Sequence, residues 1–222
     1  HSDRMDSLIS DLLLLSQLEY RDEGGLKDEM GALHSVIRNA VGICELKAQE
    51  KDISFVWECS ESIAMRINVP LLEQALINLI DNAIKYSPEK RQVEIRATIE
   101  TSGVIIEIQD QGSGIDSRHL DRIFERFYRV DAARSRKLGG TGLGLAIVKH
   151  IVQSHGGTVS VESHLNTGSK FTLKFLAPIS EKMEFDEERK VAQSAPVDEV
   201  KIDDLSKDKT NNDNKNTENK NY

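Results

Sequence analysis

Two amide side chains lie where an amphipathic helix would carry ordinary polar residues, between Pro70 and Tyr86. Asn78 and Asn82 are one helical turn apart and Lys85 continues their row, so two amides and an ammonium project together beside an apolar face. That face repeats at helical spacing and consists of Leu71, Leu72, Ala75, Leu76, Leu79, Ile80, Ala83 and Ile84. The apolar face must pack inward. The row beside it is either the solvated side of the helix or a site in which amide oxygens ligate Mg²⁺ and the ammonium faces phosphate.

The composition predicts one main domain with a polar remainder, because the 222 residues are 38% hydrophobic and 30% charged. A net charge of −8 argues against a nucleic-acid partner, which would need a basic surface. Cys44 and Cys59 are the only cysteines and lack the spacing of a disulfide framework or a zinc site, so we expect two buried free thiols. No apolar run approaches the roughly 20 residues that span a bilayer. The chain starts at His1 directly before a helical pattern, so we expect a fragment whose membrane attachment, if any, lies in an absent upstream segment.

The order of helix and strand patterns predicts an α+β two-layer sandwich rather than a doubly wound sheet. The predicted helices cover residues 5–18, 29–49, 70–86 and 142–155, and the predicted strands cover residues 53–59, 64–67, 93–99, 104–110, 158–161 and 170–176. Residues 116–127 are expected to form a short helix or turn, and residues 131–140 a polar, basic loop.

These patterns divide the chain into three segments. Residues 1–25 carry a broad apolar helical face and then a glycine-rich break, which predicts half of a helical hairpin or dimer module and a linker. A helix that packs on its own domain would show the same pattern. Residues 26–178 form the main domain. Residues 179–222 are rich in Asp, Glu, Lys and Asn and are expected to be a disordered tail.

The segment DQGSG, residues 110–114, ends a predicted strand with the carboxylate of Asp110 and with two glycines, Gly112 and Gly114. Such a carboxylate can accept a hydrogen bond from an exocyclic amine, and the glycines let a flat base approach the backbone. The same pattern also occurs in turns for purely structural reasons.

A second glycine-rich segment, GGTGLGL at residues 139–145, opens a predicted helix after the basic loop. Free amides at a helix N-terminus, combined with flexible glycines, favour anion binding. The glycine spacing is neither that of a Walker loop nor that of a Rossmann fingerprint.

Taken together and in order, these segments resemble the catalytic ATP-binding domain of bacterial sensor histidine kinases, from Met5 to about Leu176. NLIDNAIKYS is similar to the N box of that family, DQGSGI to its first glycine box, IFERFYRVD to its F box and GGTGLGLAIVK to its second glycine box. RMDSLISDLLLLSQLE is similar to the end of the second helix of the dimerisation and phosphotransfer module. Within the family, the motifs look like those of the phosphate-regulon sensor type. The resemblance implies a mixed sheet with helices on one face, as in the histidine kinase, gyrase and chaperone ATPases.

The resemblance also implies ATP and Mg²⁺ as cofactors and assigns four catalytic residues. Asn82 would ligate Mg²⁺, and Asn78 would help to hold the metal and the phosphates. Lys85 would contact phosphate, and Arg129 is a further candidate for a phosphate contact.

Around the base, the resemblance implies that Asp110 accepts a hydrogen bond from the adenine amine and that Tyr86 packs nearby. Gly112 and Gly114 would give the base room. The other residues expected at the nucleotide are Ile115, Gly140, Thr141, Gly142, Leu143, Gly144 and Leu145. Residues 129–140 would form a mobile lid over the triphosphate, with the backbone of Gly140, Gly142 and Gly144 as its hinge.

Two further features of the family bear on the helical module. Phe124 and Phe127 would dock the domain onto that module, although plain core packing of either residue has the same signature. The phosphoacceptor of the family is a His followed by Glu on a helix upstream of residues 5–18, and none of the six histidines here is followed by Glu. We therefore expect the acceptor to lie outside this chain.

The resemblance predicts an ATP:protein-histidine phosphotransferase, whose phosphoryl group passes to a response regulator. It also predicts a homodimer formed through the N-terminal helical module and a cytoplasmic domain of a cell-membrane sensor. Two alternatives remain open. One is a related ATPase of the gyrase, chaperone and mismatch-repair group, in which a Glu activates water where this chain has Asn78. The other is a nucleotide-binding regulatory domain without transfer activity.

Overall fold

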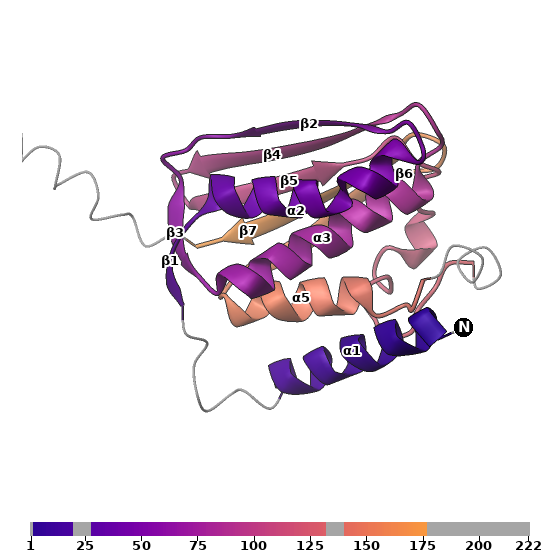
Figure 1. The fold of residues 1–222 in the computed structure, drawn as a ribbon, viewed down its shortest axis with the longest axis horizontal. Helices are drawn as coiled ribbons and strands as arrows, with labels where there is room; N and C mark the ends of the chain where they lie inside the picture. The colour runs from indigo at the N-terminus through magenta and orange to yellow at the C-terminus, as the bar shows by residue number, and fades with distance from the viewer. Residues whose placement is uncertain (1, 20–27, 132–139, 177–222) are drawn as a thin grey trace, which may run out of the picture. The chain divides into compact units, whose positions relative to one another are not determined.

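A five-stranded sheet is the centre of the computed structural model, which describes residues 2–19, 28–131 and 140–176 (Figure 1). In spatial order its strands are β2 (Ser54–Cys59), β4 (Gln92–Glu100), β5 (Gly103–Gln109), β7 (Gly168–Phe175) and β6 (Thr158–His164). β2 runs parallel to β4, and the other neighbouring pairs are antiparallel. The sheet is therefore mixed, and the expected α+β architecture is confirmed.

Burial along the strands follows their position in the sheet. In β4, Val93, Ile95 and Ala97 are buried while the residues between them are more exposed, as the two-residue repeat of a half-buried strand requires. β5 is buried at nearly every position because it lies in the middle, between β4 and β7.

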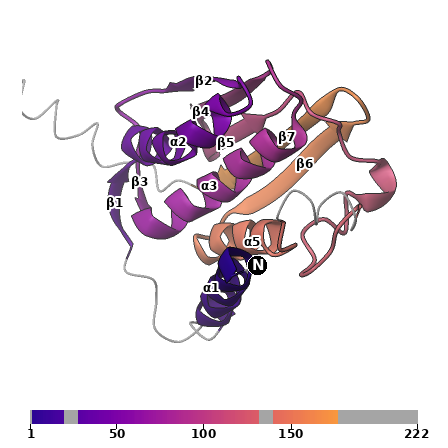
Figure 2. The same cartoon turned by 45° about the vertical axis from the view of Figure 1, so that its right-hand side comes forward.

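Within the described part of the chain, α2 (Leu33–Gln49), α3 (Val69–Tyr86) and α5 (Gly144–Ser154) cover one face of this sheet (Figures 1 and 2). The side chain of Asn68 caps α3 by accepting a hydrogen bond from the backbone N–H of Leu71 at 3.2 Å, and Pro70 lies in the first turn, where no N–H is needed. The apolar face of α3 is buried as predicted, for example at Leu72 and Leu76, and its amide row lies at the edge of the core.

The predicted helix over residues 29–49 is wrong at its start. Glu29–Ala32 form strand β1, which pairs antiparallel with β3 (Ala64–Ile67), and α2 begins only at Leu33. The pairing brings the backbone of Gly31 so close to β3 that a Cβ there would lie 2.8 Å from the side chain of Ile67. A tertiary contact thus overrides the helical pattern of the segment.

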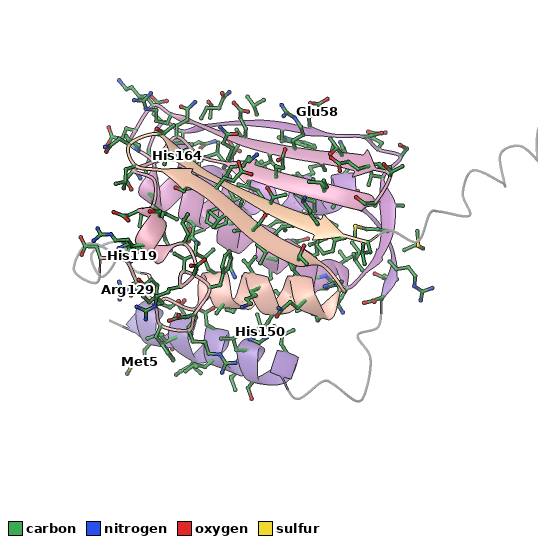
Figure 3. The ribbon with its side chains drawn as sticks, turned by 180° about the vertical axis from the view of Figure 1, so that it is seen from behind. Met5, Glu58, His119, Arg129, His150 and His164 are labelled. Atoms are coloured by element: carbon green, nitrogen blue, oxygen red, sulfur yellow. The ribbon has the colours of Figure 1, made fainter. Side chains whose placement is uncertain are left out.

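α1 (Ser2–Glu19) packs against α5 through part of its apolar face (Figure 2). Leu15 is only 2% exposed at this contact. The other part of the face is open to solvent at Met5, Ile9, Leu12 and Leu13, and Figure 3 shows Met5 on the side of α1 that points away from α5. One side of the helix thus packs on its own domain, the other side is exposed, and its role in a dimer module stays a prediction.

Some expectations fall outside the described residues, namely the linker at 20–27, residues 132–139 of the expected lid and the tail from 177 onward. In the part of the chain that is described, no helix is both long and apolar enough to cross a membrane. Cys44 is buried, Cys59 is half-buried, and both are free thiols.

Candidate functional site

A cavity of about 450 Å³ lies between α3, the loop that follows β5 and the segment that leads into α5. It brings together most of the residues that the sequence predicted, although these come from four separate segments. They are Asn78, Asn82, Lys85, Tyr86, Asp110, Gly114, Ile115, Arg129, Gly140, Thr141, Gly142, Gly144 and Leu145. Gly112 and Leu143 were also predicted but do not line it.

Asp110 lies in the part of the cavity wall that follows β5, which we call the Asp110 end, and is only 6% exposed. Its Oδ1 accepts hydrogen bonds from the backbone N–H groups of Gly112 at 2.7 Å and Ser169 at 3.2 Å. Burial raises the pKa of this carboxyl, and the hydrogen bonds lower it only in part. A carboxylate has acceptor sites beyond these two bonds, so Asp110 can still accept a hydrogen bond from a ligand in the cavity.

The glycines beside Asp110 are required by the protein's own backbone. A Cβ on Gly112 would lie 2.8 Å from the carbonyl oxygen of Tyr86, and a Cβ on Gly114 would lie 2.0 Å from the carbonyl oxygen of His164. Gly114 also has a φ of +65°, which favours glycine. The structure adds one reason for these glycines, because their loop packs directly against neighbouring backbone, and the room that they would give a base stays a prediction.

Thr141 fixes the second glycine-rich segment. Its Oγ1 accepts a hydrogen bond from the backbone N–H of Leu143 at 3.2 Å and donates one to Oδ2 of Asp11 on α1 at 2.9 Å. Leu143 is fully buried and anchors the segment in the core. Burial raises the pKa of Asp11, and the bond from Thr141 and the charge of Lys85 oppose that rise. Through Asp11, α1 thus places a carboxylate in the cavity wall.

The two amides on α3 have different surroundings. Asn78 accepts a hydrogen bond from Gln74 Nε2 at 3.3 Å and donates one to the carbonyl oxygen of Gly144 at 3.5 Å. Asn82 lines the cavity, and its side chain forms no hydrogen bond with another residue of the described ranges. The amide of Asn82 is therefore free to bind a ligand.

Asp81 and two lysines carry the charge in the part of the cavity wall around Asn82, which we call the Asn82 end. The two carboxylate oxygens of Asp81 pair with Lys47 at 2.7 Å and with Lys85 at 2.5 Å. Burial raises the pKa of Asp81, but the two lysines outweigh burial and hold this pKa below its usual value. Lys85 is thus aligned by a carboxylate of its own helix, and its ammonium keeps other donors for a phosphate.

Lys51 holds the C-terminal end of α3 in place. Its Nζ donates to the carbonyl oxygens of Ile84 at 2.7 Å, Lys85 at 3.2 Å and Ser87 at 2.7 Å. Because Asn82 lies in the turn just before these carbonyls, Lys51 also fixes the backbone that presents its amide.

The remaining predicted residues lie beside the cavity. Arg129 lines it, and Figure 3 shows this residue near the N-terminal end of α1. Phe124 packs against the core and meets the ring of Phe171 edge-on, with 6.4 Å between the ring centroids. Phe127 is 56% exposed and has a φ of +62°. Core packing therefore accounts for Phe124, and docking by Phe127 stays a prediction.

Sequence reasoning missed several polar residues that line the cavity, among them Asp11, Lys47, Asp81 and Ser169. Asp81 had a detectable signal, because it directly precedes Asn82 and lies four residues before Lys85 on the same helix. Asp11 lies in the segment that resembles the end of the dimerisation helix, where nothing marked it as a cavity residue, and no local pattern marks Lys47 or Ser169.

Residues 67–179, just over half of the 222-residue chain, match the family described as histidine kinase-, DNA gyrase B- and HSP90-like ATPases. The chain belongs to this family. The match includes both amides of α3, Asp110 and the second glycine-rich segment, so most of the residues around the cavity lie within it, whereas Asp11 and Lys47 lie before it.

Individual relatives within this family are sensor kinases. The phosphate regulon sensor protein PhoR of Pseudomonas aeruginosa is 37% identical over 174 residues, which cover 78% of this chain and 39% of PhoR. The chain spans less than half the length of the curated relatives that it matches.

Two solved structures share the fold. The histidine kinase AdeS of Acinetobacter baumannii superposes with a TM-score of 0.66 at 26% identity, over 80% of each chain. Full-length ShkA in complex with AMPPNP superposes with a TM-score of 0.67 at 28% identity, over 79% of this chain and 36% of ShkA.

Proposed function

We propose that this chain binds ATP in the cavity and acts as the catalytic domain of a sensor histidine kinase. The γ-phosphoryl group would pass to a histidine of the dimerisation module, and from there to an aspartate of a response regulator. One observation carries the proposal: a single cavity joins the buried carboxylate of Asp110, the free amide of Asn82 and the ammonium of Lys85. The structure of the similar kinase ShkA with AMPPNP, an ATP analogue, supports a nucleotide as the occupant.

At the Asp110 end, Asp110 accepts a hydrogen bond from the exocyclic amine of adenine. Its Oδ1 is already fixed by two backbone N–H groups, so the carboxylate does not have to reorient when the base arrives. Ile115 and Tyr86 provide apolar surface on the same cavity wall.

At the Asn82 end, Lys85 and Arg129 face the phosphates. The donor set fits a hydrated Mg²⁺, because the amide of Asn82 has no competing hydrogen bond among the described residues and amide oxygen is a hard ligand. Asn78 lies one turn earlier and would assist. When bound there, Mg²⁺ supplies positive charge against the phosphates.

Positioning, rather than covalent participation by this chain, then carries the reaction. The base is held at one end and the phosphates at the other, so the γ-phosphoryl group can be presented in line with an acceptor nitrogen. No histidine here is followed by Glu, and His155 is engaged in the fold, because its Nε2 accepts a hydrogen bond from the backbone N–H of Asn68 at 2.9 Å. We therefore place the acceptor on a separate helical segment.

The exposed side of α1 is the proposed dimer surface of the whole protein, which we place at the cytoplasmic side of a cell membrane. A response regulator is the proposed recipient of the phosphoryl group. The most specific form of this proposal is that the whole protein senses phosphate, which the name of PhoR suggests for that relative.

A clamp-type ATPase is the rival function, and the geometry at Asn78 disfavours it. Water attack needs a general base, whereas this position holds an amide that already bonds to Gln74 and Gly144.

The deciding experiment mixes this chain with γ-labelled ATP and a separate dimeric helical module that carries a His-Glu acceptor. We expect acid-labile label on the module and none on this chain. The matched control is the same module with its acceptor His replaced by Ala. Release of free phosphate without phosphohistidine would favour the clamp ATPase, and nucleotide binding without either reaction would favour a regulatory domain.

A further inference from the structure

β6 carries a hydroxyl where its own pattern predicts an apolar residue. Val159 and Val161 are half-buried and pack against the core, and Ser163 takes the next position on the same face. The residues between them are exposed. A polar side chain on the inner face needs hydrogen-bond partners, so its contacts indicate why it is there.

The hydroxyl of Ser163 has three partners. It donates to the carbonyl oxygen of Gly168 at 2.9 Å, accepts from the backbone N–H of Ile115 at 2.8 Å and lies 2.9 Å from Oγ of Ser169. A hydroxyl has one proton and two lone pairs. When Ser169 gives its single proton to the carboxyl of Asp110, the single proton of Ser163 is shared between Gly168 and Ser169, while a lone pair of Ser163 accepts from Ile115.

Two of these partners belong to the Asp110 end of the cavity. Ile115 and Ser169 line the cavity, and the backbone N–H of Ser169 donates to Oδ1 of Asp110 at 3.2 Å. The hydroxyl of Ser169 also contacts the carboxyl of Asp110 and helps to lower its pKa. Ser163 itself does not line the cavity. Ser163 therefore contacts two residues that line the cavity without lining it itself.

We infer that Ser163 is a positioning residue for base recognition, which fixes Ile115 and Ser169 around the carboxylate of Asp110. This inference rests on the proposed function, in which Asp110 accepts a hydrogen bond from the adenine amine. Without the Ser163 hydroxyl, the N–H of Ile115 loses its acceptor and the hydroxyl of Ser169 loses a partner. Recognition of the base then weakens, whereas the contacts at the Asn82 end stay unchanged.

The test compares the dissociation constants of ATP and ITP, because ITP carries a carbonyl where ATP carries the exocyclic amine. The wild-type chain should prefer ATP. Ser163→Ala should reduce this preference about fivefold, the effect of one hydrogen bond, and should leave the affinity for ITP within about twofold. Ser160→Ala removes an exposed hydroxyl from the same strand and should leave the preference intact. Ser163→Thr keeps the hydroxyl and should retain the preference.

An unchanged preference in Ser163→Ala, or an equal loss of affinity for both nucleotides, would overturn the inference. If Ser163→Ala does not fold, the near-isosteric Ser163→Cys decides, because its thiol is a weaker hydrogen-bonding group. A reduced preference in that variant supports the inference, and an intact preference overturns it. A wild-type chain that binds neither nucleotide contradicts the proposed function itself, and the inference with it, before any variant is needed.

Discussion

The two ends of the cavity are built from different interactions. At the Asp110 end the carboxylate is almost fully buried, and backbone N–H groups of Gly112 and Ser169 hold it. At the Asn82 end, charged side chains pair with one another, as Asp81 does with Lys47 and Lys85, and one amide is left without a partner among the described residues.

The Asp110 end is therefore ordered before a ligand binds, whereas the Asn82 end is completed by the ligand. Backbone hydrogen bonds keep Asp110 in one place whether or not a base is present, so little ordering remains to be done on binding. Lysine side chains can exchange one anionic partner for another, so a phosphate can share or replace the carboxylate that now aligns them. Substitutions at the Asp110 end should therefore affect the fold and base recognition together, whereas those at the Asn82 end should affect chemistry more than folding.

Gly114→Ala should break the Asp110 end and have the largest effect on stability. The new Cβ would meet the carbonyl oxygen of His164 at 2.0 Å, on a backbone with a φ of +65°. Gly156→Ala is the matched control, because Gly156 has a φ of +68° but nothing lies within 4 Å of its Cβ position. In urea unfolding we expect a loss of about 1 kcal/mol for the control and about 3 kcal/mol for Gly114→Ala. Equal losses would show that the close packing of this loop is unimportant.

Asn82→Ala should break the chemistry of the other end with little effect on the fold. Loss of the amide oxygen should reduce phosphotransfer to a histidine module by about 100-fold, because a group that offsets phosphate charge is removed. Thermal unfolding without nucleotide should change little, since the amide has no partner among the described residues. Asn39→Ala, at an exposed amide of α2, serves as the control. Transfer within twofold of the wild-type rate would remove Asn82 from the proposed site.

Asp110→Asn should change base recognition and stability in opposite directions at the Asp110 end. Calorimetry should show ATP binding weakened by about 1.5–3 kcal/mol, the range for a hydrogen bond to a charged group. The folded pKa of Asp110 is raised, so folding favours the neutral carboxyl, and stability falls as pH rises through that pKa. Above that pKa the charged form carries the penalty, which a neutral amide avoids. The variant should therefore lose less thermal stability than wild type as pH rises through that pKa, and an unchanged affinity for ATP would rule out this contact with the base.

Asp81→Asn should have the opposite effect on stability. The folded pKa of Asp81 lies below its usual value, so its favourable contribution is present at neutral pH and is lost as pH falls through that lowered pKa. The variant should lose about 1 kcal/mol at pH 7, the upper range for a partly exposed ion pair, and should lose less stability than wild type below about pH 4. Parallel acid-unfolding curves for the two proteins would contradict this assignment.

Asp11→Asn should produce the smallest change. This carboxylate of α1 lies in the cavity wall and would face the phosphates, so its neutralisation should tighten ATP binding about twofold at low salt. Asp6→Asn, on an exposed position of the same helix, should not change the affinity. Weaker binding of ATP by Asp11→Asn would show that the carboxylate assists the ligand.

The features that the sequence predicted correctly are set by residues close together in the chain. The apolar face of α3, the place of Pro70 in its first turn, the hairpin of β4 and β5 and the glycine-rich segments all follow from short-range spacing, and the structure has them. The helical start at Glu29 was wrong because β1 is stabilised by its pairing with β3 more than 30 residues away, which no short window contains.

The polar residues around the cavity were harder to predict from the sequence. Asp11, Lys47 and Ser169 reach it only because three distant elements meet there. The parallel pairing of β2 with β4 was equally hidden, since alternation within a strand does not encode the direction of its neighbour. Ser163 can be noticed in the sequence, because it follows Val159 and Val161 in the two-residue repeat of β6 and is polar. Its role cannot be predicted locally, since its partner Ile115 lies in another loop.

The contact of Lys51 with the end of α3 has an electrostatic consequence. The unpaired carbonyls of a helix C-terminus carry roughly half a negative charge, and here that end lies within two turns of the amide and the ammonium that would meet a triphosphate. An uncompensated helix end would repel such an anion. The ammonium of Lys51 is bonded to two of these carbonyl oxygens, those of Ile84 and Lys85, and to that of the C-cap residue Ser87. It therefore supplies the opposite charge on the side of the helix end where the carbonyls point. The protein can thus present the C-terminal half of a helix to phosphates, the half whose dipole is unfavourable for anions.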